Sequence, residues 1–354
     1  MNESSDANDP GKSLPKRLVT LVRKTFKWVW LLCQVFLVTW AALAIYYSNL
    51  PWRPLRVALA LSFVVFSFWA LRLSRNWRMR AIFVLLFLGV LAWWITIQPP
   101  AGRVWRPEVA IMPRAIVNGD RVQLLNFRNF DYRSADDFTV RYENREVSLT
   151  HLVSVDLYIS YWGPDIVGHT FVSFCFDNAP PVCISIEIRP DKDQSFAVIP
   201  TLFKQFQLIY VVGDERDLVR VRTDYRHERV YLYHIRATSQ GARRLFLAYL
   251  ERINKLADHP EFYHLLKNSC TVNIVRYANT VGKDWRIDYR LRLNGLADRY
   301  FYANGYLDTS LPFRELRRRS QINDAAVAAD DGANFSERIR AGLPIPQGSN
   351  NLTR

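Results

Sequence analysis

Three long apolar runs in the first hundred residues constrain the fold of this chain more than any other feature of its sequence. They span residues 28–47, 57–71 and 81–97, and the first contains no charged residue. An apolar helix of about 20 residues covers the roughly 30 Å of hydrocarbon in a bilayer, and flanking arginines extend a shorter run by reaching the interface. The sequence therefore predicts a multi-pass membrane module at residues 28–97 that crosses the bilayer three times.

Basic residues beside these runs predict which side of the membrane each end occupies. Residues 1–27 carry six Lys and Arg and the second link carries four, whereas the first link carries two. Cytoplasmic loops are enriched in Lys and Arg, so we expect a basic cytoplasmic N-terminus and a soluble domain on the outer side. A signal peptide cleaved near residues 41–44 is the alternative, but its leader is unusually long and two further apolar runs follow it.

The net charge of the chain is concentrated in the same region. Residues 1–106 hold fourteen Lys and Arg against three Asp and Glu, a balance of +11 within a total of +14. A nucleic-acid-binding protein needs a basic face on its folded domain. We therefore expect membrane lipids as partners, and no nucleic acid.

The remainder of the chain has an α+β pattern between two less regular segments. Residues 98–125 contain four prolines and predict a linker, and residues 323–354 are rich in Ala, Asp, Gly and Ser and predict a loosely ordered C-terminal tail. Alternating apolar residues predict strands within the domain at residues 126–322. The expected strands are 151–160, 169–176, 182–188, 208–212 and 230–235. Helices are expected at 239–256, with a Ser cap, and from about residue 268 to 280.

The hairpin formed by residues 169–188 carries the first two candidate site residues. Its even positions are apolar and predict the core-facing side, while His169 and Glu187 share the opposite side on different strands. Pairing of odd with odd positions brings the Glu187 carboxylate within reach of the His169 imidazole. Such a carboxylate fixes the tautomer of a catalytic histidine and stabilises its protonated form.

Cys270 is the third candidate. A cap at Asn268 or Ser269 places its thiol in the first turn of a helix, where unpaired N–H groups favour the thiolate and can stabilise an oxyanion. Thiol, imidazole and carboxylate make a nucleophile, base and orienting set. The residues alone leave open a simpler role for Cys270 as a buried small apolar side chain.

Two other cysteines lie in the hairpin. Cys175 and Cys183 can face each other in a disulfide, but cross-strand bridges are geometrically demanding, which favours two free thiols. A zinc site formed by His169, Cys175 and Cys183 lacks CxxC or HExxH spacing. We therefore expect no metal and no cofactor.

Several short motifs resemble one envelope-protein family. They are HTFVSF at 169–174, IEIR at 186–189, ERD at 215–217, PEFY at 260–263 and NSCT at 268–271. In this order they resemble the family that includes the periplasmic domain of the Lnb-type lipoprotein N-acyltransferase, over about residues 125–340. That family is similar to permuted NlpC-type papain-like enzymes, including lecithin:retinol acyltransferase-like enzymes, in which His precedes Cys.

The resemblance implies a protein of the bacterial inner membrane whose papain-like domain faces the periplasm. It also implies Cys270 as nucleophile, His169 as base and Glu187 as third member. One departure is that Asn is expected immediately before the Cys, whereas Ser269 stands there. The implied activity is a thiol acyltransferase or lipid hydrolase acting on acyl groups of phospholipids or lipoproteins.

Two alternatives remain at this stage. The first is a cell-wall peptidase or amidase that uses the same dyad on peptidoglycan, and the second is a non-catalytic envelope scaffold. Exposed apolar side chains around the cleft favour a lipid substrate, whereas a polar groove favours a peptide.

Overall fold

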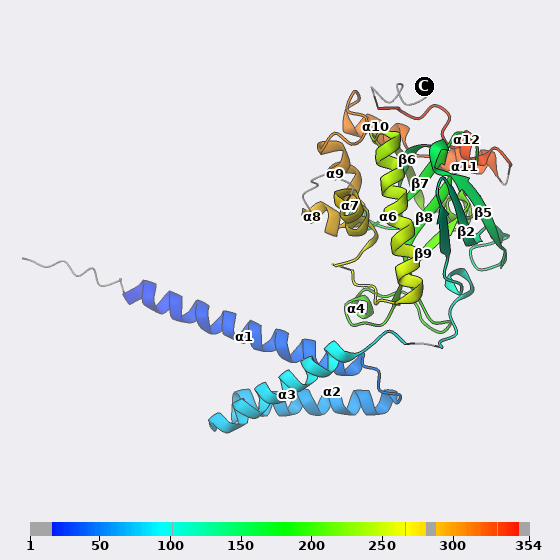
Figure 1. Cartoon of the computed structure of the whole chain (residues 1–354). Helices are drawn as coiled ribbons and strands as arrows, with labels where there is room; N and C mark the ends of the chain where they lie inside the picture. The colour runs from blue at the N-terminus through cyan, green and yellow to red at the C-terminus, as the bar shows by residue number, and fades with distance from the viewer. Residues whose placement is uncertain (1–15, 101, 266, 281–287, 331, 347–354) are drawn as a thin grey trace, which may run out of the picture. The chain divides into compact units, whose positions relative to one another are not determined.

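The computed structural model of the chain describes residues 16–100, 102–265, 267–280, 288–330 and 332–346. It divides into two compact units, Met1–Ile97 and Gln98–Arg354 (Figure 1).

The first unit contains three helices that are long and apolar enough to cross a membrane, as the sequence predicts. Their bounds are Thr20–Tyr46 within α1 (Lys16–Tyr46), Arg53–Leu73 formed by α2 (Arg53–Phe68) with the π turn η1 (Trp69–Leu73), and Trp77–Thr96, which is α3. Proline in the first turn starts α2, and the Asn76 side chain caps α3 by accepting from the Arg78 amide at 3.0 Å. The second span exceeds its predicted length because arginine-containing ends continue the helix.

The second unit is built on an eight-stranded sheet. Its path is β1-β2-β9-β8-β7-β6-β10, with β5 also paired to β2. The strands are β1 (Arg114–Asn118), β2 (Arg121–Arg128), β5 (Tyr142–Ser148), β6 (Leu152–Tyr161), β7 (His169–Phe176), β8 (Val182–Arg189), β9 (Gln207–Gly213) and β10 (Arg229–His234). All pairs are antiparallel except β2 with β9. The predicted hairpin is confirmed as β7 and β8, and β3 (Asp131–Tyr132) pairs with β4 (Phe138–Thr139) separately.

Both faces of this sheet are buried. The even face of the hairpin packs against α6 (Ser239–Asp258), where the rings of Phe174 and Phe246 lie 4.8 Å apart (Figure 1). The helices α7 (Cys270–Thr280) and α9 (Ala297–Ala303) contribute to the same core. On the odd face, Phe171 stacks on Tyr158 with ring centroids 4.7 Å apart, and both rings belong to a second cluster of buried apolar residues. The odd positions are therefore enclosed as well.

The second cluster includes part of the predicted loosely ordered tail, so that prediction was wrong up to residue 346. The helices α11 (Asn323–Ala329) and α12 (Phe335–Arg338) bury Ala326 and Phe335 completely. Arg340 then reaches inward to Asp156 at 2.9 Å and Glu215 at 2.6 Å, and both carboxylates are inaccessible to solvent. Small alanine side chains allow this segment to approach the sheet closely. Residues 347–354 lie outside the described residues.

The predicted linker is also shorter than expected. Both β1 and β2 begin before residue 126, and they are joined by a two-residue turn in which Gly119 has φ +60°. A glycine with positive φ in this position is typical of tight hairpins. The Asn254 amide of α6 bonds both backbone groups of Ala115, which satisfies this part of the edge strand. Arg189, at the end of β8, holds the segment before β1 by donating to the carbonyls of residues 109 and 110.

Short helical segments connect and cover the sheet. They are η2 (Pro107–Val109), η3 (Leu149–His151), α4 (Val198–Thr201), α5 (Glu215–Leu218), the π turn η4 (Val221–Tyr225), α8 (Tyr289–Arg292), η5 (Asn294–Leu296) and α10 (Phe313–Arg319). Four of these, α4, η4, α8 and η5, contribute residues to the candidate site.

Candidate functional site

The first residue of β7 is His169, and the hairpin register places it beside β8. Phe171 pairs with Ser185 and Ser173 with Cys183, so odd positions face odd positions as predicted. The distance between His169 Nε2 and Glu187 Oε1 is 3.8 Å. The Ser185 hydroxyl bridges the two groups, at 2.7 Å from Nε2 and 2.7 Å from Oε1. The sequence therefore predicted the juxtaposition but not the serine between its members.

This bridge fixes the tautomer of the neutral imidazole. The Ser185 hydroxyl has one proton, which it donates to Glu187. It must therefore accept from the Nε2–H of His169. That assignment leaves the Nδ1 lone pair of His169 available to a thiol.

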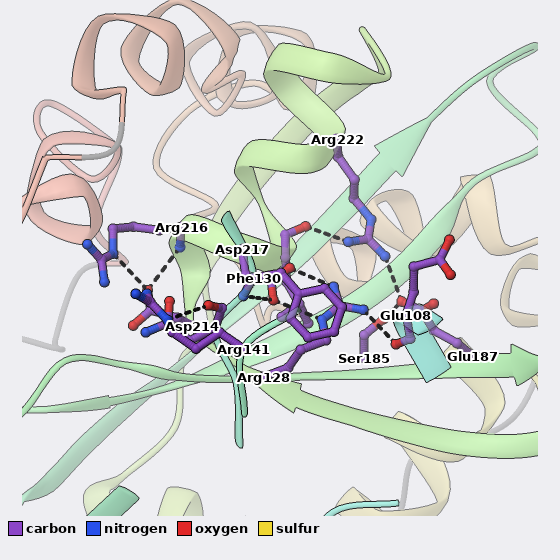
Figure 2. A network of polar contacts seen from close by, with 12 residues as sticks. Glu108, Arg128, Phe130, Arg141, Ser185, Glu187, Asp214, Arg216, Asp217 and Arg222 are labelled. Atoms are coloured by element: carbon purple, nitrogen blue, oxygen red, sulfur yellow. Dashed lines mark hydrogen bonds and ion pairs between the residues drawn. The ribbon is translucent and has the colours of Figure 1, made fainter. Parts of the chain in front are cut away.

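Arg222 of η4 holds Glu187 in its ionised form. Its Nη2 lies 2.7 Å from Glu187 Oε1, and its guanidinium group packs over the Phe171 ring at 4.8 Å (Figure 2). Burial alone would raise the pKa of Glu187, but Arg222 and then His169 lower it well below its usual range. The carboxylate therefore stays negative and can stabilise a charged imidazole.

The Glu215–Asp217 motif supports this arrangement from beneath η4. Asp217 is completely buried and bonds the Arg128 guanidinium at 2.7 Å and the Phe130 amide at 2.8 Å (Figure 2). The motif is thus part of an internal ion-pair cluster and not a solvated turn. It fixes α5, and thereby the start of the turn that carries Arg222.

Cys270 is the first residue of α7, as predicted. The Asn273 amide makes the first helical hydrogen bond to the Ser269 carbonyl at 3.0 Å. Asn268 orders the preceding loop, because its side chain donates to the Phe262 carbonyl at 3.0 Å. The departure from the family motif thus leaves Asn268 with a structural contact, and not one to the thiol.

Several groups determine the ionisation of Cys270. Burial raises the pKa of its thiol, but the charge and hydrogen bond of His169, followed by hydrogen bonds with Thr170, lower the pKa to about 7. In contrast, burial raises the pKa of both Cys175 and Cys183. Cys270 is therefore the most readily ionised of these three thiols near neutral pH, and the thiolate is the nucleophilic form.

A contact that the sequence analysis missed is made by Asn294 in η5. Its Nδ2 donates to the Cys270 sulfur at 3.1 Å, while its Oδ1 accepts from the Thr271 hydroxyl at 3.0 Å. The second bond orients the amide so that its N–H groups face the thiol. A donor in this position can stabilise negative charge on sulfur or on a nearby oxyanion.

Gly295 allows η5 to approach the loop before β7. A Cβ atom on it would lie 2.5 Å from the Asp165 carbonyl oxygen and 2.6 Å from the Ile166 carbonyl carbon. Its own carbonyl accepts from the Tyr161 hydroxyl at 2.9 Å. Only glycine fits this contact, which presses the Asn294 segment against the loop.

A cavity of about 490 Å³ lies over these groups. His169, Glu187, Cys270 and Asn294 all contribute to its lining. Most of the remaining wall is apolar and comes from the loop before β7, the end of β8, residues 196–198, residues 263–265 and Leu293. The charged groups of this otherwise largely hydrocarbon surface are Arg222, Arg226 and Arg292 with the carboxylates Glu187 and Glu228, both of which lie near Arg222.

The cysteines of the hairpin do not form a disulfide. Cys183 pairs with Ser173 and not with Cys175, and all four cysteines of the chain are free thiols. Cys175 instead donates to Asp156 at 3.3 Å, within the network that contains Arg340.

Comparison with known proteins identifies the central part of the second unit. Residues 138–298 match the family model described as the Lnb N-terminal periplasmic domain. No curated protein and no solved structure matches the chain. The matched range contains four residues that line the cavity: His169, Glu187, Cys270 and Asn294. The match covers less than half of the chain, and together with the three apolar helices it indicates a membrane protein with a periplasmic domain similar to that of the Lnb type.

Proposed function

We propose that this protein is a thiol acyltransferase or lipid hydrolase acting on acyl groups of phospholipids or lipoproteins in the bacterial inner membrane. The observation that carries the proposal is a largely apolar cavity of about 490 Å³ lined by a thiol whose pKa is about 7. Apolar walls suit a hydrocarbon chain, and an ionisable thiol suits attack on its ester carbonyl.

In the first half-reaction, His169 accepts the Cys270 proton through Nδ1 and the sulfur attacks the ester carbonyl carbon. An S–C bond forms, and the tetrahedral oxyanion receives hydrogen bonds from Asn294 and from the first backbone amides of α7. The ester C–O bond then breaks, and the imidazolium returns the proton to the leaving alkoxide. The products are an S-acyl enzyme and a lysolipid.

In the second half-reaction, His169 removes a proton from an amine or from water, which attacks the thioester carbonyl. The S–C bond breaks and the sulfur recovers a proton, leaving an amide in the first case and a fatty acid in the second. Glu187, through Ser185, stabilises the imidazolium present in both halves. The order of His before Cys, with the thiol at a helix start and the imidazole on a strand, also supports a permuted papain-like relationship.

Two observations favour lipid over a cell-wall peptide. The cavity wall is mainly hydrocarbon, whereas peptide recognition needs backbone hydrogen-bonding groups. Three apolar helices also keep the enzyme in the compartment of its substrate, which raises the effective concentration of that substrate.

The test is intact-protein mass spectrometry of the full chain in detergent after incubation with phospholipid. We expect an acyl-sized, hydroxylamine-labile adduct on the wild type and on Cys175→Ala, but none on Cys270→Ala. An ordered, alkylatable Cys270 that forms no adduct with phospholipid or with a diacylated lipopeptide would refute the proposal and favour the peptidase or scaffold function. The Cys175→Ala control separates acylation at the proposed site from labelling of another thiol.

A further inference from the structure

A set of large apolar side chains is exposed at the mouth of the cavity. Each one lines the cavity and yet presents 41–56 % of its surface to solvent. The set, which we term the rim, consists of Trp162, Ile166, Val167, Phe196, Val198 and Leu293. Single exposed apolar residues are ordinary on protein surfaces, but a contiguous group around one opening marks an interaction site.

The rim is assembled from three segments distant in sequence. The loop before β7 supplies three members, the residues around the start of α4 supply two, and the segment after α8 supplies Leu293. No single local sequence pattern accounts for such a grouping, because each segment reaches the cavity by a different route through the fold. The shared feature of the rim residues is the opening that they surround.

Positive charge accompanies the rim. Arg226 and Arg292 are exposed and line the same cavity, and no carboxylate among the described residues pairs with either. Asp165 lies in the loop before β7 and is neutralised by Arg229 at 2.9 Å and Arg317 at 2.8 Å. The opening therefore combines hydrocarbon with unpaired cations.

We infer that the rim docks on the bilayer surface and takes its lipid substrate directly from the leaflet. Apolar side chains enter the boundary between headgroups and acyl chains, with Trp162 suited to that boundary, and Arg226 and Arg292 meet lipid phosphates. An acyl chain then moves from the leaflet into the apolar cavity without crossing water. A bilayer is a better partner than a protein for two reasons. The spans hold the chain in a bilayer, and the cations match the anionic phosphates of lipid headgroups.

This inference rests on the proposed function for its purpose, but its first test does not depend on catalysis. A spin label is attached at Val198→Cys in the full chain, with Cys33→Ser and Cys270→Ala to remove competing thiols, in phospholipid nanodiscs. The matched control is Val327→Cys, since Val198 and Val327 have similar exposures of 55 % and 58 %. We expect the label at 198 to be accessible to oxygen and protected from a water-soluble nickel chelate, and the label at 327 to show the reverse.

Equal access of the nickel chelate to both labels would overturn the inference. Dipolar broadening between labels at residue 198 would also overturn it, because that result places a second copy of the chain on the rim. Protection of the label at 198 supports docking even if no acyl adduct ever forms, so the proposed function can fail separately.

A kinetic test then connects docking with turnover. The full chain is placed in nanodiscs of ether-linked lipids, which contain no acyl ester, and receives either a long-chain ester phospholipid in the disc or a short-chain one dissolved below its micelle concentration. We expect Ile166→Ser/Val198→Ser to slow acylation of Cys270 from the disc about tenfold more than it slows acylation from solution. Ile116→Ser/Val327→Ser, with Ile116 at 52 % exposure against 51 % for Ile166, should change neither rate. Equal slowing with both donors would contradict docking and indicate a role inside the cavity.

Discussion

Replacing His169 by alanine removes the group that most strongly lowers the pKa of the Cys270 thiol. Burial raises this pKa, yet the imidazole and the hydrogen bonds with Thr170 bring it from 9.0 to about 7. A change of two pKa units corresponds to about 2.7 kcal/mol of preferential stabilisation of the thiolate. Without His169 only the hydrogen bonds oppose burial, so we expect the pKa to return to about 9 or above.

The assay is the pH dependence of Cys270 alkylation by iodoacetamide, followed by mass spectrometry of the full chain in a Cys33→Ser background. At pH 7 the thiolate fraction falls from about one half to about one per cent, a loss of about 50-fold. A more basic thiolate is also more nucleophilic, by about eightfold over two pKa units, so the net decrease in rate is only about sixfold. The midpoint of the pH profile is therefore the better observable, and we expect it to rise from about 7 to about 9.

The lowered pKa of the thiol also makes the stability of the fold depend on pH. A thiol whose pKa is lower in the folded state contributes stability that is fully present above pH 9 and is lost as the pH falls through 7. The unfolding free energy of the wild type should therefore rise between pH 7 and pH 9, and that rise should be absent in His169→Ala. A midpoint that stays near 7 in a correctly folded His169→Ala protein would refute the assignment of His169 as the neighbour that activates the thiol. Ser185→Ala should shift the midpoint in the same direction by less, because the imidazole remains.

Three further substitutions test other parts of the domain. Arg340→Ala leaves Glu215 buried without its cation and Asp156 with His234 alone, and should lower the unfolding free energy by about 3–5 kcal/mol in a denaturant titration. Arg121→Ala, which removes an exposed ion pair, should cost less than about 1 kcal/mol, and equal losses would show that the buried network does not hold the C-terminal segment. Asn294→Ala should slow thioester formation by about 100-fold and raise the alkylation midpoint by less than His169→Ala does, whereas an unchanged acylation rate would exclude Asn294 from stabilising the oxyanion.

The parts of the fold that follow local rules could be predicted from the sequence. Period-two alternation identified the β7–β8 hairpin and placed His169 and Glu187 on one face, because strand geometry fixes the side of each residue. The start of α7 at Cys270 was predicted from Asn268 and Ser269 as caps, although the Asn268 side chain bonds residues 262 and 264 and the Ser269 hydroxyl bonds Asn294. The cap of α6 was misplaced by one residue, since the Thr238 hydroxyl, and not Ser239, accepts from the Gly241 amide at 3.1 Å.

The contacts that complete the site depend on tertiary docking. Asn294 is 24 residues from Cys270 and reaches it only because η5 packs against the loop before β7. The sequence offered an Asn-Gly pair there, which indicates a turn but gives no chemical role. Strand parity placed Ser185 on the correct face, but its bridging position depends on side-chain rotamers that parity does not determine.

Two segments were predicted incorrectly for different reasons. The hairpin of β1 and β2 had a local signal, Asn118 followed by Gly119 between alternating residues, that was outweighed by the prolines nearby. In contrast, α11 and α12 are only seven and four residues long, which is too short to establish a helical period. Their order comes from burial against the sheet and from Arg340, and neither is visible in composition.

The glycine at position 295 gives the cavity a mechanical property. It brings the backbone of the loop that carries Ile166 and Val167 into direct contact with the segment that carries Asn294. A longer acyl chain that pushes this loop outward would also shift the amide that bonds the Cys270 sulfur. Under the proposed function, chain length and thiol reactivity are therefore coupled, so variants that change the preferred acyl length through this loop should change the rate of the chemical step as well.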